Sequence, residues 1–360
     1  MPDDTGRAIT VLGEVNSSDL GVVMIHEHIQ HGDELFEPLY TPYGREIAEQ
    51  PLDVSMFGTL WRYPLANRDN VTFGRDDGIA EELARFEAAG GGTAVEMTCV
   101  GLSPDPDAVA QISQDSGVHI VMGCGYFVDG LLPDSFDALT VDQLADGLVQ
   151  DITVGINGTQ VRAGIIGEVG TSPVITEREE RSLRASARAA LRTGVAINIH
   201  LSHSVCPGAE SHDAVEPGFS ALDILESEGV PPSRVICGHL DEAQDADYAA
   251  RLIDRGCVVG YDTFGTEWYW DNWKTWEPHD SRRVADVAEL CRRGLHDSIV
   301  LSQDVAFKRQ LRRHGGLGYD HLLVNIVPML EDAGVTDQQL RAMLTETPRR
   351  LLTVSRGVGP

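Results

Sequence analysis

Short runs of β-branched and other apolar residues recur along the chain, and each is followed by a segment with the periodicity of an amphipathic helix. The expected strands are residues 21–25, 93–99, 119–123, 163–166, 195–199, 235–237, 257–261 and 299–301. The expected helices are residues 77–89, 105–116, 141–152, 176–192, 218–228, 245–254 and 281–292. Because the strands are apolar throughout and alternate with helices, they predict parallel βαβ units. Eight such units favour an α/β fold of the (β/α)₈ TIM barrel type, with a doubly wound open sheet as the competitor.

Length alone leaves the number of domains open. At roughly 150 residues per domain the chain would divide in two, but a single barrel of this size is common. We therefore expect one domain over residues 1–360, with a long loop at residues 31–76 after the first strand and closing helices at residues 321–354.

Charge and composition narrow the class of protein. The chain is 42% hydrophobic, which is enough for a large core, and it carries 56 acidic against 28 basic residues, a formal charge of −28. Such a field repels phosphate backbones and anionic membrane surfaces, so we expect no nucleic acid and no membrane as partners. The start of the chain lacks the plan of a signal peptide, and the expected location is cytoplasmic.

Six ionisable residues stand where the expected apolar strands stop. They are His26, His28, Glu168, His200, His239 and Asp304. Taken singly, each could cap the helix that follows its strand. In a barrel, however, the carboxyl ends of the strands converge on one face, the face that carries active sites. Four histidines and two carboxylates suffice to hold two divalent metal ions bridged by a carboxylate and a hydroxide.

The first two of these residues form a His-Glu-His sequence. Because side chains alternate along an extended strand, His26 and His28 face the same side while Glu27 points away. Two imidazoles can then share one metal ion.

With these residues in place, the sequence resembles the phosphotriesterase family of the amidohydrolase superfamily, and within it the phosphotriesterase-related branch. The stretches that carry the resemblance are residues 87–96, 164–170, 261–267 and 314–321. The resemblance covers nearly the whole chain and implies the barrel fold, two divalent metals and hydrolysis. It also implies that His26, His28 and Asp304 hold the more buried metal, that His200 and His239 hold the more exposed one, and that Glu168 spans both.

One departure from the founding phosphotriesterases concerns the bridge. Those enzymes use a carbamylated lysine on the fourth strand, whereas this chain has Glu168 there, and its only two lysines, Lys274 and Lys308, lie far along the sequence. The related branch shows the same glutamate. The departure therefore leaves the metal site intact but puts organophosphate turnover in doubt as the native activity.

The expected activity is that of a binuclear metal-dependent hydrolase. A metal-bridging hydroxide would attack a carboxylic amide, ester or lactone bond of a small-molecule substrate, because two cations sharing one water bring its pKa near neutrality. Asp304, Glu168 and His239 carry the catalytic assignment, with Asp304 as general base. Zinc is the expected metal, with manganese, cobalt or iron as alternatives. The competing functions are phosphotriesterase activity and a non-catalytic, metal-loaded binding protein.

Substrate contacts are harder to assign. Trp268 and Trp270 belong to a tryptophan-rich stretch that could wall the pocket or form an interface, and a homodimer is left open. Lys308 and Arg309 could bind an anionic group or simply pair with surface acids. Tyr126 could donate to the substrate carbonyl or could belong to the core.

Overall fold

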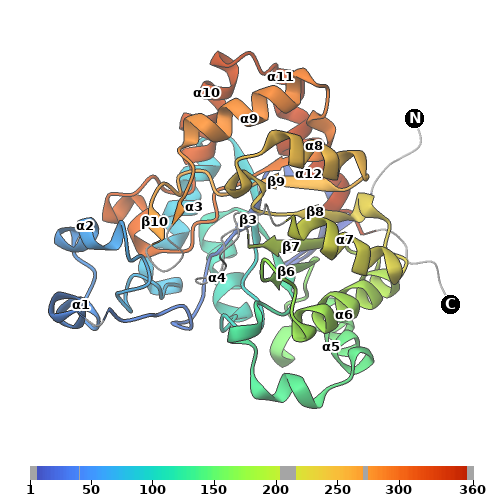
Figure 1. Cartoon of the computed structure of the whole chain (residues 1–360), viewed down its shortest axis with the longest axis horizontal. Helices are drawn as coiled ribbons and strands as arrows, with labels where there is room; N and C mark the ends of the chain where they lie inside the picture. The colour runs from blue at the N-terminus through green and yellow to red at the C-terminus, as the bar shows by residue number, and fades with distance from the viewer. Residues whose placement is uncertain (1–5, 40, 203–215, 271–274, 355–360) are drawn as a thin grey trace.

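Eight parallel strands form the centre of the computed structural model, which describes residues 6–39, 41–202, 216–270 and 275–354. Their bounds are β3 (Val22–Glu27), β4 (Gly91–Glu96), β5 (His119–Cys124), β6 (Ile165–Thr171), β7 (Ile197–Leu201), β8 (Val235–Cys237), β9 (Val258–Tyr261) and β12 (Ile299–Leu301). Each strand pairs with its neighbour in chain order. The first and last meet just beyond β12, where the Asp304 N–H donates to the His26 carbonyl (3.2 Å) and the His28 N–H to the Val305 carbonyl (3.3 Å). The sheet thus closes, and the predicted (β/α)₈ barrel is confirmed (Figure 1).

Helices alternate with these strands and cover the outside of the barrel (Figure 1). They are α3 (Ile79–Ala88), α4 (Pro106–Ser116), α5 (Val141–Thr153), α6 (Glu177–Thr193), α7 (Pro217–Ser227), α8 (Ala246–Asp254) and α9 (Asp280–Arg292), followed by α10 (Val327–Asp332), α11 (Asp337–Arg341) and α12 (Thr347–Leu352). Their ends follow local chemistry. Thr140 and Thr176 accept hydrogen bonds at the starts of α5 and α6, and Gly194 ends α6 with a φ of 78° that favours glycine.

The interior of the barrel is a separate apolar layer to which seven of the eight strands contribute, with the segment before β7 completing it. Its strand residues, with Ala196 just before β7, are Val23, Ile25, Val95, Val121, Ile165, Ala196, Ile236, Val258 and Val300. Residues next to them, such as Met24 and Ile166, pack outward in the larger layer beneath the helices. This two-sided burial explains why the strands read as continuous apolar runs.

A hairpin that the sequence analysis did not predict closes the end where the strands begin. It consists of β1 (Arg7–Thr10) and β2 (Gly13–Asn16), paired antiparallel. The Val11 N–H donates to the Ile120 carbonyl near the start of β5 (2.8 Å), and Ala8 joins the interior layer with Leu351 and Leu352 of α12. Each hairpin strand has only four residues, too few for a periodic pattern to reveal.

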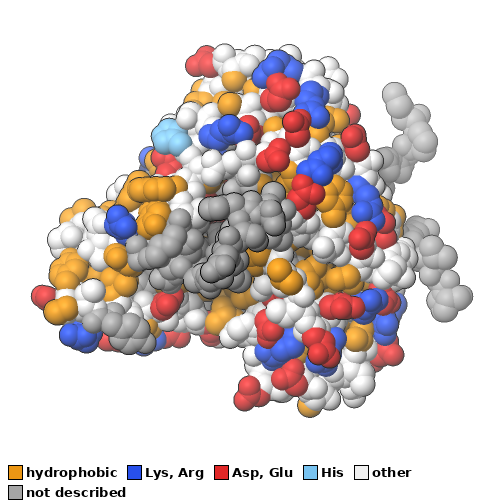
Figure 2. Space-filling view, in the orientation of Figure 1, with side chains coloured by type: hydrophobic (Ala, Val, Ile, Leu, Met, Phe, Trp, Pro, Cys, Tyr) orange, Lys and Arg blue, Asp and Glu red, His pale blue; other side chains and the backbone are white. Residues whose placement is uncertain are grey.

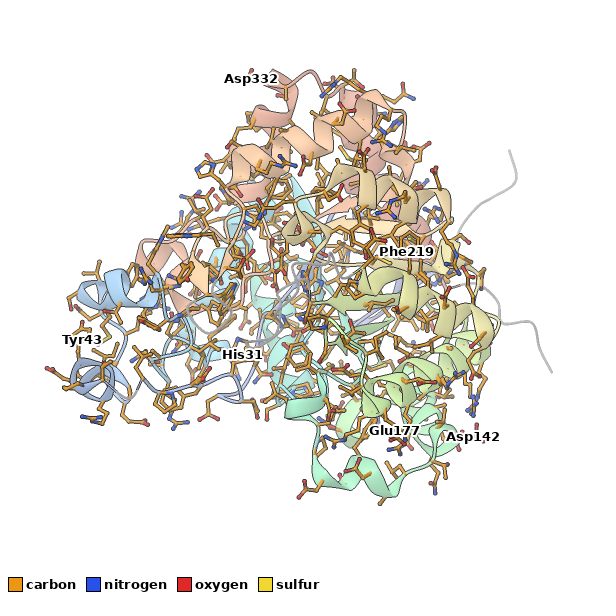
Figure 3. The ribbon with its side chains drawn as sticks, viewed as in Figure 1. His31, Tyr43, Asp142, Glu177, Phe219 and Asp332 are labelled. Atoms are coloured by element: carbon orange, nitrogen blue, oxygen red, sulfur yellow. The ribbon has the colours of Figure 1, made fainter. Side chains whose placement is uncertain are left out.

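The segment at residues 31–76 extends to one side of the barrel and has its own short helices, α1 (Pro42–Ile47) and α2 (Phe57–Leu60). Figure 3 places Tyr43 at its outer edge and His31 near the barrel. Hydrophobic side chains gather on the surface of this region, whereas charged side chains intersperse over α5, α6 and α8 (Figure 2). In the described part of the chain, no helix is long and apolar enough to cross a membrane.

Candidate metal centre and active site

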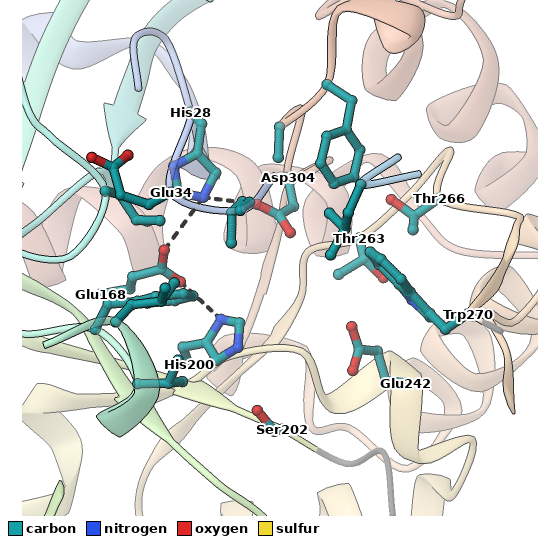
Figure 4. A pocket seen from close by; sticks show the side chains of 18 of the residues that line it. His28, Glu34, Glu168, His200, Ser202, Glu242, Thr263, Thr266, Trp270 and Asp304 are labelled. Carbon is teal, nitrogen blue, oxygen red and sulfur yellow. Dashed lines mark hydrogen bonds and ion pairs between the residues drawn. The ribbon is translucent and has the colours of Figure 1, made fainter. Parts of the chain in front are cut away.

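The barrel brings the six predicted ligands to one end, where the strands finish. His26 lies near the end of β3 and His28 just after it; Glu168 and His200 lie in β6 and β7. His239 follows β8 and Asp304 follows β12. Figure 4 shows four of these side chains turned toward a common space. Residues from five strands therefore meet at the face that carries active sites in barrels.

The carboxylate of Glu168 stands at the centre of this cluster. Its Oε1 lies 3.3 Å from Nε2 of His28, and its Oε2 lies 3.4 Å from Nε2 of His26 and 2.8 Å from Nδ1 of His200. Asp304 Oδ1 is 3.3 Å from the same His28 nitrogen. His239 Nε2 is 2.8 Å from Nδ1 of His200. Two donor groups consist of predicted ligands alone, His26 with His28 and Asp304, and Glu168 with His200 and His239. A third joins His26 and His239 to Asp262.

Several atoms of the cluster are buried with no hydrogen-bond partner among the described residues. They are both ring nitrogens of His26, Oε1 of Glu168 and Oδ1 of Asp304. Buried polar atoms in proteins are nearly always paired, so an unpaired group of nitrogen and carboxylate donors indicates a site that a cation completes. Imidazole and carboxylate suit divalent transition metals. The residues present therefore fit a metal centre.

The electrostatic interactions among these histidines and carboxylates also indicate a metal centre. Burial by itself would lower the pKa of His28, but Asp304 and Glu168 raise it to about 9. Burial would raise the pKa of Glu168, yet the histidines around it hold that pKa well below its usual range. Because a metal must displace protons from such histidines, its binding weakens as the pH falls.

Irregular backbone places three of the ligands. The register of β6 against β7 shifts between Ile166 and Val169, so Glu168 turns inward although regular alternation with Ile165 would turn it out. His239 and Asp304 have φ values of 58° and 52°, in the left-handed region that residues other than glycine rarely adopt. Such conformations cluster at functional sites.

The sequence analysis missed two residues that orient the imidazoles. Asp262, fully buried directly after β9, accepts a hydrogen bond from the His239 N–H (2.7 Å) and lies 3.0 Å from Nδ1 of that ring. Its other oxygen is 3.5 Å from Nδ1 of His26. Thr98 Oγ1 lies 2.9 Å from Nδ1 of His28. Asp262 carries the same signal as the six predicted ligands, an ionisable residue where a strand stops, and could have been found by it.

A cavity of about 450 Å³ opens above the ligands (Figure 4). His28, Glu168, His200 and Asp304 contribute to its lining, and most of the remaining wall is apolar. The apolar wall includes Leu35, Phe36, Leu65, Leu102, Phe127, Leu131, Trp268, Trp270 and Phe307. Trp268 and Trp270 thus lie at the pocket, one of the two positions that the sequence left open, and the 31–76 segment supplies part of the wall.

Acidic side chains also reach this cavity. Glu34, Glu37, Glu242 and Glu277 line it, and no lysine or arginine does so in the described part of the chain. Burial raises the pKa of Glu277 to about 7, and burial together with Glu277 raises that of Glu242. Glu242 and Glu277 therefore hold their protons more readily than exposed glutamates do.

The other three expected substrate contacts lie outside the cavity lining. The Tyr126 hydroxyl donates to the Leu144 carbonyl (3.1 Å), a partner that satisfies it within the core. Lys308 Nζ pairs with Asp69 (2.6 Å) and Asp77 (2.7 Å), because the chain turns outward after Asp304. Arg309 packs over the Trp268 ring and lines a different cavity. The structure thus corrects the placement expected for these three side chains.

Comparisons with known proteins agree with this geometry. The model of the phosphotriesterase family matches residues 6–352. The chain is 33% identical to an N-acetyltaurine hydrolase of Danio rerio over 98% of this chain and 99% of that one. A resiniferatoxin-binding protein of Rhodobacter sphaeroides has a similar structure, with a TM-score of 0.91 and 32% identity over 97% and 96% of the two chains. The phosphotriesterase homology protein of Escherichia coli, solved with phosphate in its active site, gives a TM-score of 0.74 and 28% identity over 93% and 99%. The chain belongs to the phosphotriesterase family and is a metal-dependent hydrolase.

Proposed function

We propose that the protein hydrolyses a carboxylic amide of a small molecule, with lactones and esters as related substrates, and that it uses two divalent cations, zinc first among them. The observation that carries the proposal is the Glu168 carboxylate, whose two oxygens face both donor groups at the floor of a largely apolar cavity. An N-acetyltaurine hydrolase, which acts on an amide, is 33% identical to this chain and supports the choice of bond.

The chain's own residues then have distinct tasks. The six ligands would hold divalent cations, which would supply a water deprotonated near neutral pH and would polarise the substrate carbonyl. Asp304 accepts the proton released in the attack and passes it to the leaving group. It is suited to this because its side chain is 23% exposed and lines the cavity, whereas that of Glu168 is 1% exposed. Asp262 and Thr98 hold the rings of His239 and His28.

The cavity lining also bears on the substrate. Because the described lining residues other than the metal ligands include four glutamates and no lysine or arginine, we expect uncharged or amine-bearing leaving groups to be preferred over sulfonates and carboxylates. The charge of its leaving group therefore distinguishes the preferred substrate from N-acetyltaurine.

The test is a hydrolysis screen on protein purified without chelators. It compares N-acetyl amines, N-acetyltaurine, lactones, aryl esters and phosphotriesters, with zinc, manganese and cobalt forms assayed side by side and metal content measured on the same samples. We expect about two metal equivalents per chain and the fastest turnover on an uncharged amide. Glu168→Gln is the control, since it keeps the side chain's size but removes the shared charge.

Two results would contradict the proposal. Phosphotriester turnover faster than that of every amide, ester and lactone would favour the alternative activity. A fully metal-loaded protein without turnover on any of these classes would favour a binding function.

A further inference from the structure

A second cavity, of about 300 Å³, lies beside the first and shares Trp268 with it. It is bounded by Phe57 and Trp61 of the 31–76 segment, by the start of the loop after β9, and by the loop after β12 that includes Arg309 and Leu317. None of the six metal ligands lines it.

Arg309 is the unusual member of this lining. Its side chain is buried, with the residue 6% exposed, and packs 4.1 Å from the centroid of the Trp268 ring. Its Nε and Nη2 have no hydrogen-bond partner among the described residues. Burial lowers the pKa of this guanidinium to about 9. A buried cation without an anion is rare in proteins, because its lost hydration is not replaced.

Arg283 shows what a buried arginine in this protein otherwise looks like. It is fully buried, and its guanidinium donates to Asp241 (2.6 Å), to the Thr263 hydroxyl (2.7 Å) and to the Thr266 carbonyl (2.9 Å). Arg309 is also buried, but no described residue accepts a hydrogen bond from its Nε or Nη2. The difference indicates that the partner of Arg309 is a molecule that enters the cavity.

Other groups at the cavity define what could enter. The indole Nε1 of Trp268 is also buried without a hydrogen-bond partner in the described part of the chain. The carboxylate of Glu267 lines the cavity but is engaged elsewhere, with the Asp280 N–H (2.8 Å) and Nε2 of His279 (3.4 Å). The wall is otherwise rich in aromatic carbon from Phe57, Trp61 and Phe264.

We propose that this cavity binds a small carboxylate with an apolar body, held by Arg309 and independent of the metal centre. The planar fork of a guanidinium matches the two oxygens of a carboxylate, and the aromatic walls suit a ring or short aliphatic chain. The proposal does not rest on the bond that the enzyme hydrolyses.

Benzoate is the probe. It is titrated into the metal-loaded protein while tryptophan fluorescence, to which Trp61 and Trp268 contribute at the cavity, and binding heat are recorded. We expect saturable binding that Arg309→Gln weakens about 10- to 100-fold, since a charge-assisted pair is lost. The control is Arg313→Gln, the same change at an exposed arginine four residues along the chain. It should leave binding unchanged.

Two further variants separate the outcomes. A carboxylate can also ligate divalent metal, so benzoate is titrated into Glu168→Gln; binding that survives there and is lost in Arg309→Gln belongs to the second cavity. Leu317→Trp narrows the cavity from its exposed rim and should weaken binding even if Arg309→Gln fails to fold. Equal affinity in wild type and Leu317→Trp, or binding that depends on Glu168 alone, would overturn the proposal, as would the absence of saturable binding to wild type.

Discussion

The two ends of the barrel are built on the same strands but differ in chemistry. Where the strands begin, Val23, Ile236 and Val300 pack against Ala8 of the N-terminal hairpin and Leu351 of α12 in a wholly apolar layer. Where they end, the same strands present histidines and carboxylates with unpaired buried atoms. The first arrangement contributes stability by burying apolar surface, whereas the second sacrifices stability to hold donors ready for a cation. A cluster of unpaired imidazole and carboxylate atoms from several strands therefore distinguishes the functional end from the structural one.

Asp304→Asn should give the largest effect, at the functional end. An asparagine keeps one coordinating oxygen but cannot accept the proton, so kcat should fall about 10²- to 10⁴-fold while metal content falls by less than half. Both quantities are measured on one preparation. Asp297→Asn is the matched control, because Asp297 has a side chain 80% exposed at the opposite end of the same strand. A value of kcat within about threefold of wild type would leave Asp304 as a ligand only.

Ile236→Ala, at the structural end, should have the opposite effect to Asp304→Asn: a large loss of stability with little loss of kcat. The side chain is fully buried in the apolar layer, so its truncation should lower the free energy of unfolding by about 2–5 kcal/mol. Ile236→Val should cost about 0.5–1.5 kcal/mol, which gives a graded control. Urea unfolding and kcat are measured together. A loss of kcat in the folded Ile236→Ala protein as large as that of Asp304→Asn would show that the two ends are not separable.

Asp262→Asn tests whether residues behind the ligands belong to the functional end. The change removes the charge that orients His239 and faces His26, so metal affinity should fall about 10- to 100-fold. Competition with a chromogenic chelator measures this. Unchanged affinity would assign Asp262 to the fold alone, and Asp297→Asn again serves as the control.

Tyr126→Phe should have the smallest effect. The hydroxyl donates to the Leu144 carbonyl and does not line the cavity, so we expect a loss of about 0.5–1.5 kcal/mol of stability and little change in kcat. If the hydroxyl instead donated to the substrate carbonyl, kcat would fall about 10²- to 10³-fold. Thermal unfolding and a kcat measurement distinguish the two roles.

The sequence predicted the barrel because eight apolar runs alternate with helices, and it predicted the ligand cluster because ionisable residues end those runs. It could not predict how Glu168 turns inward, since the register shift in β6 depends on pairing with β7 and not on alternation within the strand. The sequence also left open where the side chains of Lys308 and Arg309 lie. Both follow Asp304 closely, but whether a loop turns toward the pocket or away from it is decided by distant partners such as Asp69 and Trp268.

The junction between the first and last strands, β3 and β12, has a consequence for the order in which the protein folds. The donor group of His26, His28 and Asp304 spans the junction between the first and last strands, and the Val354 N–H donates to the Arg7 carbonyl (2.9 Å) across the two chain ends. During synthesis, the chain must therefore emerge from the ribosome at least as far as Asp304 before this donor group can form. Contacts so distant in sequence form late, and we expect metal uptake at this group to follow closure of the barrel rather than to nucleate it.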